Sequence, residues 1–307
     1  MSSVATLFEV LVRGIGIGAI YALVAMGFTL IYKVTGVLNF AQGQLALLGA
    51  YLVAVLATPV ALGGLDIQVA APIAIVATIV FGLLLGVFLE RVVFRQFIGE
   101  PVLSVIIVTL ALGGIITGLV QFLIGRDTRS YPDALQPDWS VPLLFGVDLS
   151  ASFTLGVVLS LAVVIALMAF FRYTVMGSIL RAAASDQQAA MVLGVSIERT
   201  IVLAWAISIA ITAIGGMLLA MSQGAAGFGI YAVGILIFAA VVLGGLDSIP
   251  GAFIGAIVVG VLQEFGYYYL EGHVGDGFGQ VLPMVVLLVV ILVMPYGLFG
   301  TERIERL

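Results

Sequence analysis

The chain has 307 residues, of which 63% are hydrophobic and only 9% carry charge, and its mean hydropathy is +1.31. A soluble globular domain carries about 25% charged residues, so this composition excludes water as the main solvent. Cysteine is absent and histidine occurs once, which excludes disulfides, thiol catalysis and histidine or thiolate metal clusters. We therefore expect an all-α, polytopic membrane helix bundle with no catalytic residue and no metal site.

Apolar segments recur along the chain, each long enough to cross a hydrocarbon core roughly 30 Å thick. They indicate about nine spans in a single transmembrane domain, 1–307, and counts of eight or ten also fit the pattern. The first span is too long for the apolar part of a cleaved signal peptide, so we expect it to be retained. The candidate spans are 10–32, 37–58, 67–90, 102–124, 149–171, 201–222, 231–246, 251–270 and 281–298.

The distribution of basic residues predicts the orientation, because lysine and arginine near span ends prefer the cytoplasm. If the polar segment 172–199 is cytoplasmic, eight basic residues lie inside and three lie outside. This arrangement puts the N-terminus and the loop 125–148 outside, and the C-terminal tail 301–307 in the cytoplasm. The residues expected inside are Lys33, Arg91, Arg95, Arg172, Arg181, Arg199, Arg303 and Arg306, and those expected outside are Arg13, Arg126 and Arg129.

Several spans carry glycines four residues apart, a spacing that lets helix backbones approach closely in lipid. These pairs predict generic helix packing. They are Gly14/Gly18, Gly82/Gly86, Gly114/Gly118 and Gly251/Gly255.

The cytoplasmic segment contains "RAAASDQQAAMVLGVSIERT", residues 181–200. Ser185 followed by Gln188 is a capping-box pattern, and Asp186 places negative charge in the first turn of a helix. Gly194 stands where a helix commonly ends. The pattern predicts a helix of about two turns over 186–193, which is too short to be stable alone. It is either a knob that docks on a partner or an amphipathic connector at the membrane surface.

Polar residues inside the apolar spans are candidates for a translocation pathway or gate. "LNFAQGQ" places Asn39, Gln42 and Gln44 close together near the start of the second span. Such side chains either line a path or join helices by hydrogen bonds. Glu264 in the eighth span is an intramembrane acid, which suggests function, although its position toward the outer end also allows simple hydration.

A second irregular stretch, "LGGLDSIPGAF", separates the seventh and eighth spans. Gly244, Gly245, Asp247 and Pro250 predict a helix break there. Such a break is either a hinge lining a cavity, as in membrane transporters, or a tight cytoplasmic turn.

Three stretches resemble a known family. "RAAASDQQAAMVLGV" is similar to the cytoplasmic coupling loop of ABC importer permeases, whose motif reads Glu-Ala-Ala, three residues, Gly. Gln188, Ala189, Ala190 and Gly194 match its spacing, with Gln188 in place of the acid. Residues 18–52 and 241–264 resemble the N- and C-terminal signatures of the branched-chain amino acid permease family, LivH type. The resemblance covers nearly the whole chain.

The resemblance implies the permease subunit of an ATP-driven importer for branched-chain or similar small hydrophobic amino acids, in the bacterial inner (plasma) membrane. Such transporters contain two permease subunits, two cytoplasmic ATPase subunits and an external substrate-binding protein. For the second permease subunit, a LivM-like partner is favoured over a second copy. The residues expected to contact the ATPase are Arg181, Ser185, Asp186, Gln188, Ala189, Ala190 and Gly194.

The chain itself contains no phosphate-binding loop, so we expect it to bind no cofactor and the partner subunit to use the ATP. Nothing in the sequence indicates nucleic-acid binding. The competing hypotheses are a secondary transporter, for which Glu264 is the one acid that fits, and a channel for a small polar solute such as urea or an amide. An intramembrane enzyme is disfavoured because the spans lack a His/Asp/Ser set.

Overall fold

The computed structural model describes residues 3–57, 60–62, 65–67, 69–97, 100–294 and 296–300. The C-terminal tail 301–307, including Arg303, Arg306 and its expected cytoplasmic placement, lies outside the described residues. Each of the nine apolar segments identified in the sequence overlaps a helix. The all-α expectation therefore holds for the membrane part of the described chain.

Six helical stretches are long and apolar enough to cross a membrane. In five of them the apolar run is one α-helix. The sixth combines α10 with a π-helical turn, η5, and α11. The bounds are α1 Ser3–Thr35, α3 Ala71–Val92, α4 Val102–Ile124, α5 Ala151–Tyr173, α8 Ile197–Gln223, α10 Ile249–Phe265, η5 Gly266–Leu270 and α11 Glu271–Val274.

Four further apolar helices are shorter, and two of them, α2 and α9, begin later than the apolar pattern suggests. The 16 residues of α2 extend about 24 Å at a rise of about 1.5 Å per residue, which is less than a hydrocarbon core roughly 30 Å thick. The shorter apolar helices are α2 Gln42–Ala57, α6 Val175–Ser185, α9 Val233–Gly244, which follows the 3-10 turn η4 Phe228–Ala232, and α12 Phe278–Val293.

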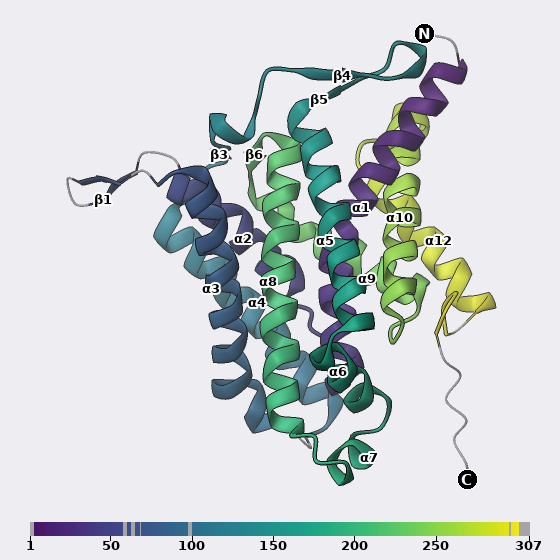
Figure 1. Ribbon diagram of the computed structural model, residues 1–307. Coiled ribbons are helices and arrows are strands. Elements are labelled where there is room, and N and C mark those ends of the chain that lie inside the picture. The colour runs from purple at the N-terminus through teal and green to yellow at the C-terminus, as the bar shows by residue number, and fades with distance from the viewer. Residues whose placement is uncertain are drawn as a thin grey trace.

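Two helices form the centre of the bundle, and the others surround them. In the most apolar 18-residue window, 89% of α1 and 78% of α8 is buried, against 28% for each of α3, α4 and α5. In Figure 1, α8 lies centrally, with α3 on one side and α10 and α12 on the other. The largest fully buried side chains include Trp205 of α8 together with Tyr21 and Phe28 of α1, so the core lies where these two helices meet.

Glycine pairs allow the helix axes to approach closely, as the spacing predicts. At three of the four predicted pairs, a Cβ added to either glycine would lie under 3.0 Å from an atom of a neighbouring helix. The fourth pair, Gly114/Gly118 of α4, is not packed in this way, because a Cβ added at either glycine would meet nothing within 4 Å. The packed pairs are Gly14/Gly18 of α1 against α10, Gly82/Gly86 of α3 against α8, and Gly251/Gly255 of α10 against α9.

Short strands and helices occupy the two ends of the bundle, which lie opposite each other in Figure 1. The predicted external loop 125–148 is folded: β3 pairs with β6, and β4 pairs with β5, both antiparallel. At the other end, the polar segment forms two helices, α6 and α7. The bounds are β1 Val60–Leu62, β2 Leu65–Ile67, η1 Phe94–Phe97, β3 Arg129–Ser130, η2 Asp133–Leu135, β4 Ser140–Pro142, η3 Leu144–Gly146, β5 Asp148–Ser150, α6 Val175–Ser185, α7 Gln187–Val192 and β6 Ala225–Ala226.

Small polar side chains determine where several helices begin. Ser150, Thr174, Asp186 and Ser248 each precede a helix and accept a hydrogen bond from a backbone N–H of its first turn. Such caps satisfy donors that have no partner within the helix. The helix starts of α5, α6, α7 and α10 are therefore encoded locally.

Candidate coupling helix and polar core

Asp186 caps the short helix α7, one residue later than the sequence pattern suggested. Its Oδ1 accepts a hydrogen bond of 2.9 Å from the Ala189 amide. Ser185 is instead the last residue of α6, and its Oγ donates to the Arg181 carbonyl over 3.0 Å. The capping role predicted for Ser185 is therefore wrong, because α6 continues as far as Ser185 and leaves Asp186 as the residue with extended backbone before α7.

Gly194 ends α7 in a Schellman motif. The Gly194 amide donates to Met191 O over 2.9 Å, and the Val195 amide donates to Ala190 O over 3.0 Å. Gly194 has φ +85°, in the left-handed region that costs an L-residue about 1–2 kcal/mol. The position predicted for the end of the helix is confirmed, and a non-glycine residue there would be strained.

A hydrogen bond ties α7 to the end of α1. The Gln187 side chain donates from Nε2 to Val34 O over 2.7 Å. Val34 lies in the last turn of α1, where carbonyl groups lack a partner within the helix. The hydrogen bond therefore links α7 to α1, the most buried of the six candidate membrane-spanning helices.

The tip of α7 is apolar and exposed. Met191, Val192 and Leu193 are 53%, 88% and 82% exposed, whereas Ala190 is 2% exposed and packs inward. Of the seven predicted contact residues, all except Ala190 are exposed: Arg181, Ser185, Asp186, Gln188, Ala189 and Gly194. The tip lies at the end of the bundle, outside the apolar spans, and presents a small hydrophobic surface. Such a surface fits both predicted roles, docking on a partner and lying at the membrane surface.

The chain leaves helical conformation between α1 and α2. Gly36 has φ +71°, and α2 begins only at Gln42, so the prediction that the second span starts at 37 is wrong. A Cβ on Gly27 would lie 3.1 Å from Gln42 Nε2, and Gly27 precedes the end of α1 by about 12 Å of helix. The non-helical segment 36–41 therefore returns into the depth of the bundle.

Backbone of this kind is tolerated at membrane depth where protein buries it. Asn39 and Ala41 are both 0% exposed. Thr109 of α4 accepts a hydrogen bond from the Phe40 amide over 3.3 Å, and its Oγ1 lies 3.4 Å from Leu38 O. The segment is therefore held by α4.

Asn39 and Gln42 form one buried polar cluster with α8 and α1. Asn39 Nδ2 donates to Gln42 Oε1 over 2.8 Å, and Gln42 Nε2 donates to Thr212 Oγ1 of α8. Ser208 Oγ, 3.5 Å from Gln42 Nε2, donates to the Gly27 carbonyl of α1 over 2.6 Å. Asn39 and Gln42 were predicted either to line a path or to join helices by hydrogen bonds. The contacts observed here are hydrogen bonds between helices.

Gln44 and Glu264 stand apart from this cluster. Gln44 contacts Gly113 of α4, and its buried Oε1 has no hydrogen-bond partner among the described residues. Glu264 lies half-buried near the end of α10, beside the buried Gln263. The four residues proposed for a pathway are therefore not gathered at one place, and their role in transport stays a prediction.

Gly244, Gly245, Asp247 and Pro250 lie in the turn that joins α9 to α10. Gly244 ends α9, Gly245 has φ +104°, and Pro250 is in the first turn of α10. The amides of Leu298 and Phe299 donate to Leu243 O and Gly244 O over 2.8 and 3.1 Å, which satisfies carbonyl groups at the end of α9. The stretch is thus a helix break with the geometry of a tight turn, pinned by the C-terminal segment.

Two polar residues with structural consequences were missed in the sequence. Gln187 follows the predicted cap, but its partner Val34 is 153 residues away in the chain, so no local signal identifies it. Glu90 is 1% exposed near the end of α3. An acid in an apolar span is itself a signal, but Glu90 coincides with the last residue of the predicted span 67–90, where charged residues are common.

Long apolar helices, a buried non-helical segment and a capped helix beyond the spans define a multi-pass membrane protein. The family model for the branched-chain amino acid transport system / permease component matches residues 10–295. The chain belongs to this family.

Individual relatives agree with the family match. The chain is 32% identical over 303 residues to the high-affinity branched-chain amino acid transport system permease protein LivH of Escherichia coli (strain K12), covering 96% of each chain. It is 30% identical over 300 residues to BraD of Pseudomonas aeruginosa, a protein described in the same words, again covering 96% of each chain. A probable LivH of Methanocaldococcus jannaschii is 29% identical over 297 residues, covering 93% of this chain and 90% of the relative. No solved structure matches.

Proposed function

We propose that this chain is the membrane-spanning permease subunit of an ATP-driven ABC importer for branched-chain or similar small hydrophobic amino acids. It assembles with a second permease subunit, two cytoplasmic ATPase subunits and an external substrate-binding protein in the bacterial inner membrane. Family membership supports the transport role, and the relatives' printed names support the substrate class. A LivM-like second subunit is favoured over a second copy, on the resemblance to the LivH type.

The observation that carries the coupling part of the proposal is the construction of α7. Its apolar tip is exposed beyond the spans, while Gln187 joins its first turn to the end of α1. A rigid helix capped at both ends transmits displacement better than a frayed one. ATPase motion received at Met191–Leu193 would therefore reach α1 and α8 and alternate the access of a central path.

Reconstitution tests the transport function. Proteoliposomes containing this chain with its ATPase and second permease subunits, supplied with binding protein, are expected to accumulate labelled leucine only when ATP reaches the ATPase. Uptake that continued without ATP and without the ATPase subunits would contradict the proposal, and would favour a secondary transporter or a channel. Urea or a short amide as sole substrate would correct the substrate class alone.

The proposed orientation predicts which side of the membrane the chain ends face. A cysteine placed at Glu305 is expected to resist an impermeant thiol reagent in intact cells and to react after permeabilisation. A cysteine at Asp148, on the strand β5 in the loop predicted to be external, serves as the matched control and is expected to react from outside. The native chain has no cysteine, so each label reports one position. Labelling of residue 305 from outside would overturn the orientation.

Gln187 and Gln188 provide a test of the contact between α7 and α1. Gln187→Ala removes the hydrogen bond to Val34 O, a bond worth about 1 kcal/mol, and ATP-driven uptake is expected to fall by roughly fivefold while the ATPase remains bound. Gln188→Ala, next in sequence and exposed, is expected to change uptake much less. Equal uptake by the two variants would show that the bond to α1 carries no coupling.

A further inference from the structure

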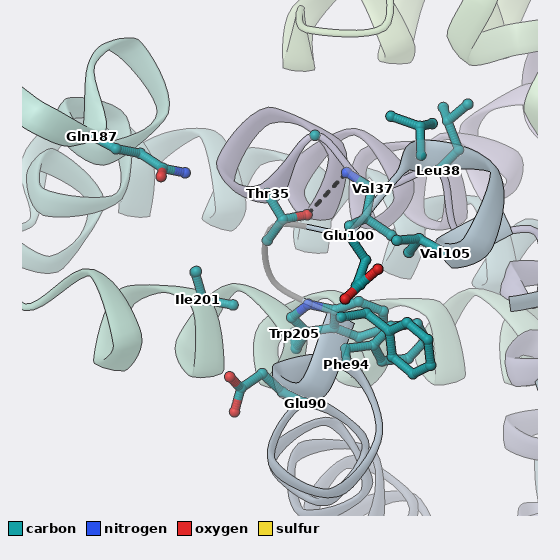
Figure 2. A pocket seen from close by; sticks show the side chains of 13 residues that line it. Thr35, Val37, Leu38, Glu90, Phe94, Glu100, Val105, Gln187, Ile201 and Trp205 are labelled. Carbon is teal, nitrogen blue, oxygen red and sulfur yellow. Dashed lines mark hydrogen bonds between the residues drawn. The ribbon is translucent and has the colours of Figure 1, made fainter. Parts of the chain in front are cut away.

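A cavity of about 250 Å³ lies where α1, α3, α4, α7 and α8 meet. Its volume is somewhat below the ~300 Å³ at the lower end of typical ligand pockets, so an occupant would be a small molecule. Figure 2 shows Glu90, Glu100, Phe94 and Trp205 around it, with Gln187 and Thr35 from the contact region of α7 and α1. The transport function does not assign a role to this cavity.

Glu90 is a buried carboxylate with half of its hydrogen-bonding capacity unused. One oxygen, Oε1, accepts a hydrogen bond of 3.4 Å from Arg95 Nε, and the residue is 1% exposed. The other oxygen, Oε2, is buried and has no hydrogen-bond partner among the described residues. Arg95 also pairs with the charge of Glu90, but a buried acceptor atom without a donor costs free energy, so a donor supplied by a ligand to Oε2 would be stabilising.

The remaining lining determines which donor fits. Phe94 and Trp205 stack with ring centroids 4.1 Å apart and 21° between their planes, and they form an apolar wall beside Val105 and Ile201. A second carboxylate, the exposed Glu100, lines the same cavity. The lining residues include no lysine, arginine or histidine, and the nearby Arg95 pairs with the other oxygen of Glu90. Two acids against an apolar wall favour a cationic donor attached to a hydrophobic body over an anion.

We propose that this cavity binds a small molecule that carries a primary ammonium group on a short apolar body. The ammonium group donates to Glu90 Oε2, and the apolar body lies against Phe94 and Trp205. Two sources share this chemistry: a neutral apolar amino acid, through its α-ammonium group, and an amine without a carboxylate. Since Gln187 and Thr35 also line the cavity, a bound ligand would touch the contact between α7 and α1.

Tryptophan fluorescence measures binding directly, because the chain has only two tryptophans and one of them lines the cavity. In the Trp139→Phe protein, as the full chain in nanodiscs, Trp205 is the sole tryptophan. We expect a saturable fluorescence change with 3-methylbutylamine and none with 4-methylpentanoate. If leucine binds at least as tightly as 3-methylbutylamine, the ligand is an amino acid. If leucine binds more weakly than the amine, the ligand is an amine without a carboxylate. A saturable change with the acid, or none with either amine or leucine, would overturn the proposal.

Substitutions test the contact to Glu90. Glu90→Gln keeps the shape of the side chain and its contact with Arg95 but removes the charge, so affinity for the amine is expected to fall about tenfold or more. Asp148→Asn, which removes an exposed carboxylate elsewhere, is the matched control and should bind as before. Glu100→Gln should weaken binding by a smaller factor, and it tests the site independently if Glu90→Gln does not fold. Unchanged affinity in both glutamate variants would contradict the assignment.

Discussion

Replacement of Gly216 by valine is expected to abolish the folded permease. Gly216 lies on α8 against α2, and a Cβ at this position would lie under 3.0 Å from three backbone atoms of Ala46. Backbone cannot move aside as a flexible side chain can, and both helices are largely buried. We expect a loss of at least about 4 kcal/mol in folding stability, beyond the usual range for overpacking.

Gly114→Val on α4 is the matched control, because a Cβ added at Gly114 would meet no atom within 4 Å. The measurement is the monodisperse fraction of the detergent-extracted chain, by size-exclusion chromatography, with membrane insertion checked by protease protection. Gly114→Val is expected to keep the wild-type monodisperse fraction, while Gly216→Val should aggregate. Equal yields for the two variants would mean that α2 and α8 do not approach as described.

Gly194→Arg is expected to disconnect the ATPase while the bundle stays folded. Arginine at φ +85° carries about 1–2 kcal/mol of backbone strain, and α7 has only six residues with which to resist it. The large side chain also stands beside the exposed tip Met191–Leu193. Because a Cβ added at Gly194 would meet no atom within 4 Å, we expect the strain to stay within α7 and the spans to remain folded.

The measurement for this variant is recovery of the ATPase subunit with the affinity-purified permease. We expect recovery to fall at least tenfold, with insertion and thermal stability of the permease unchanged. Gly194→Asn separates strain from bulk, because asparagine tolerates the left-handed region; this variant should retain most of the ATPase. Wild-type recovery with Gly194→Arg would show that α7 is not the docking element.

The positions of the helices follow from hydrophobicity and from small polar caps, both of which are local. The apolar runs locate the major helices, because a segment in lipid must satisfy its backbone N–H and C=O groups internally, and an α-helix does so. The first residues of the predicted second span are not helical, because apolar composition cannot distinguish a helix from the non-helical segment 36–41. Only the partner Thr109 on α4 and the α8 residues that contact Gln42 explain that segment.

The coupling helix was the most predictable part of the candidate site. Asp186 and Gly194 make their hydrogen bonds to residues close to them in the chain, so a local pattern identifies them. The predicted cap at Ser185 was wrong by one residue, because α6 extends as far as Ser185. Gln187 and Glu90 depend on Val34 and on the cavity between helices. No pattern in sequence spacing reports such contacts, because they form only when distant segments pack.

In the proposed transport cycle, α7 receives the motion of the ATPase. A photo-crosslinking residue in place of Val192, which is 88% exposed, tests this role in the assembled transporter. We predict a crosslink to the ATPase subunit whose yield differs between the ATP-bound and nucleotide-free states. A crosslinker at Val192 that reacts only with lipid or with the permease subunits, in a transporter that still hydrolyses ATP and imports leucine, would contradict it.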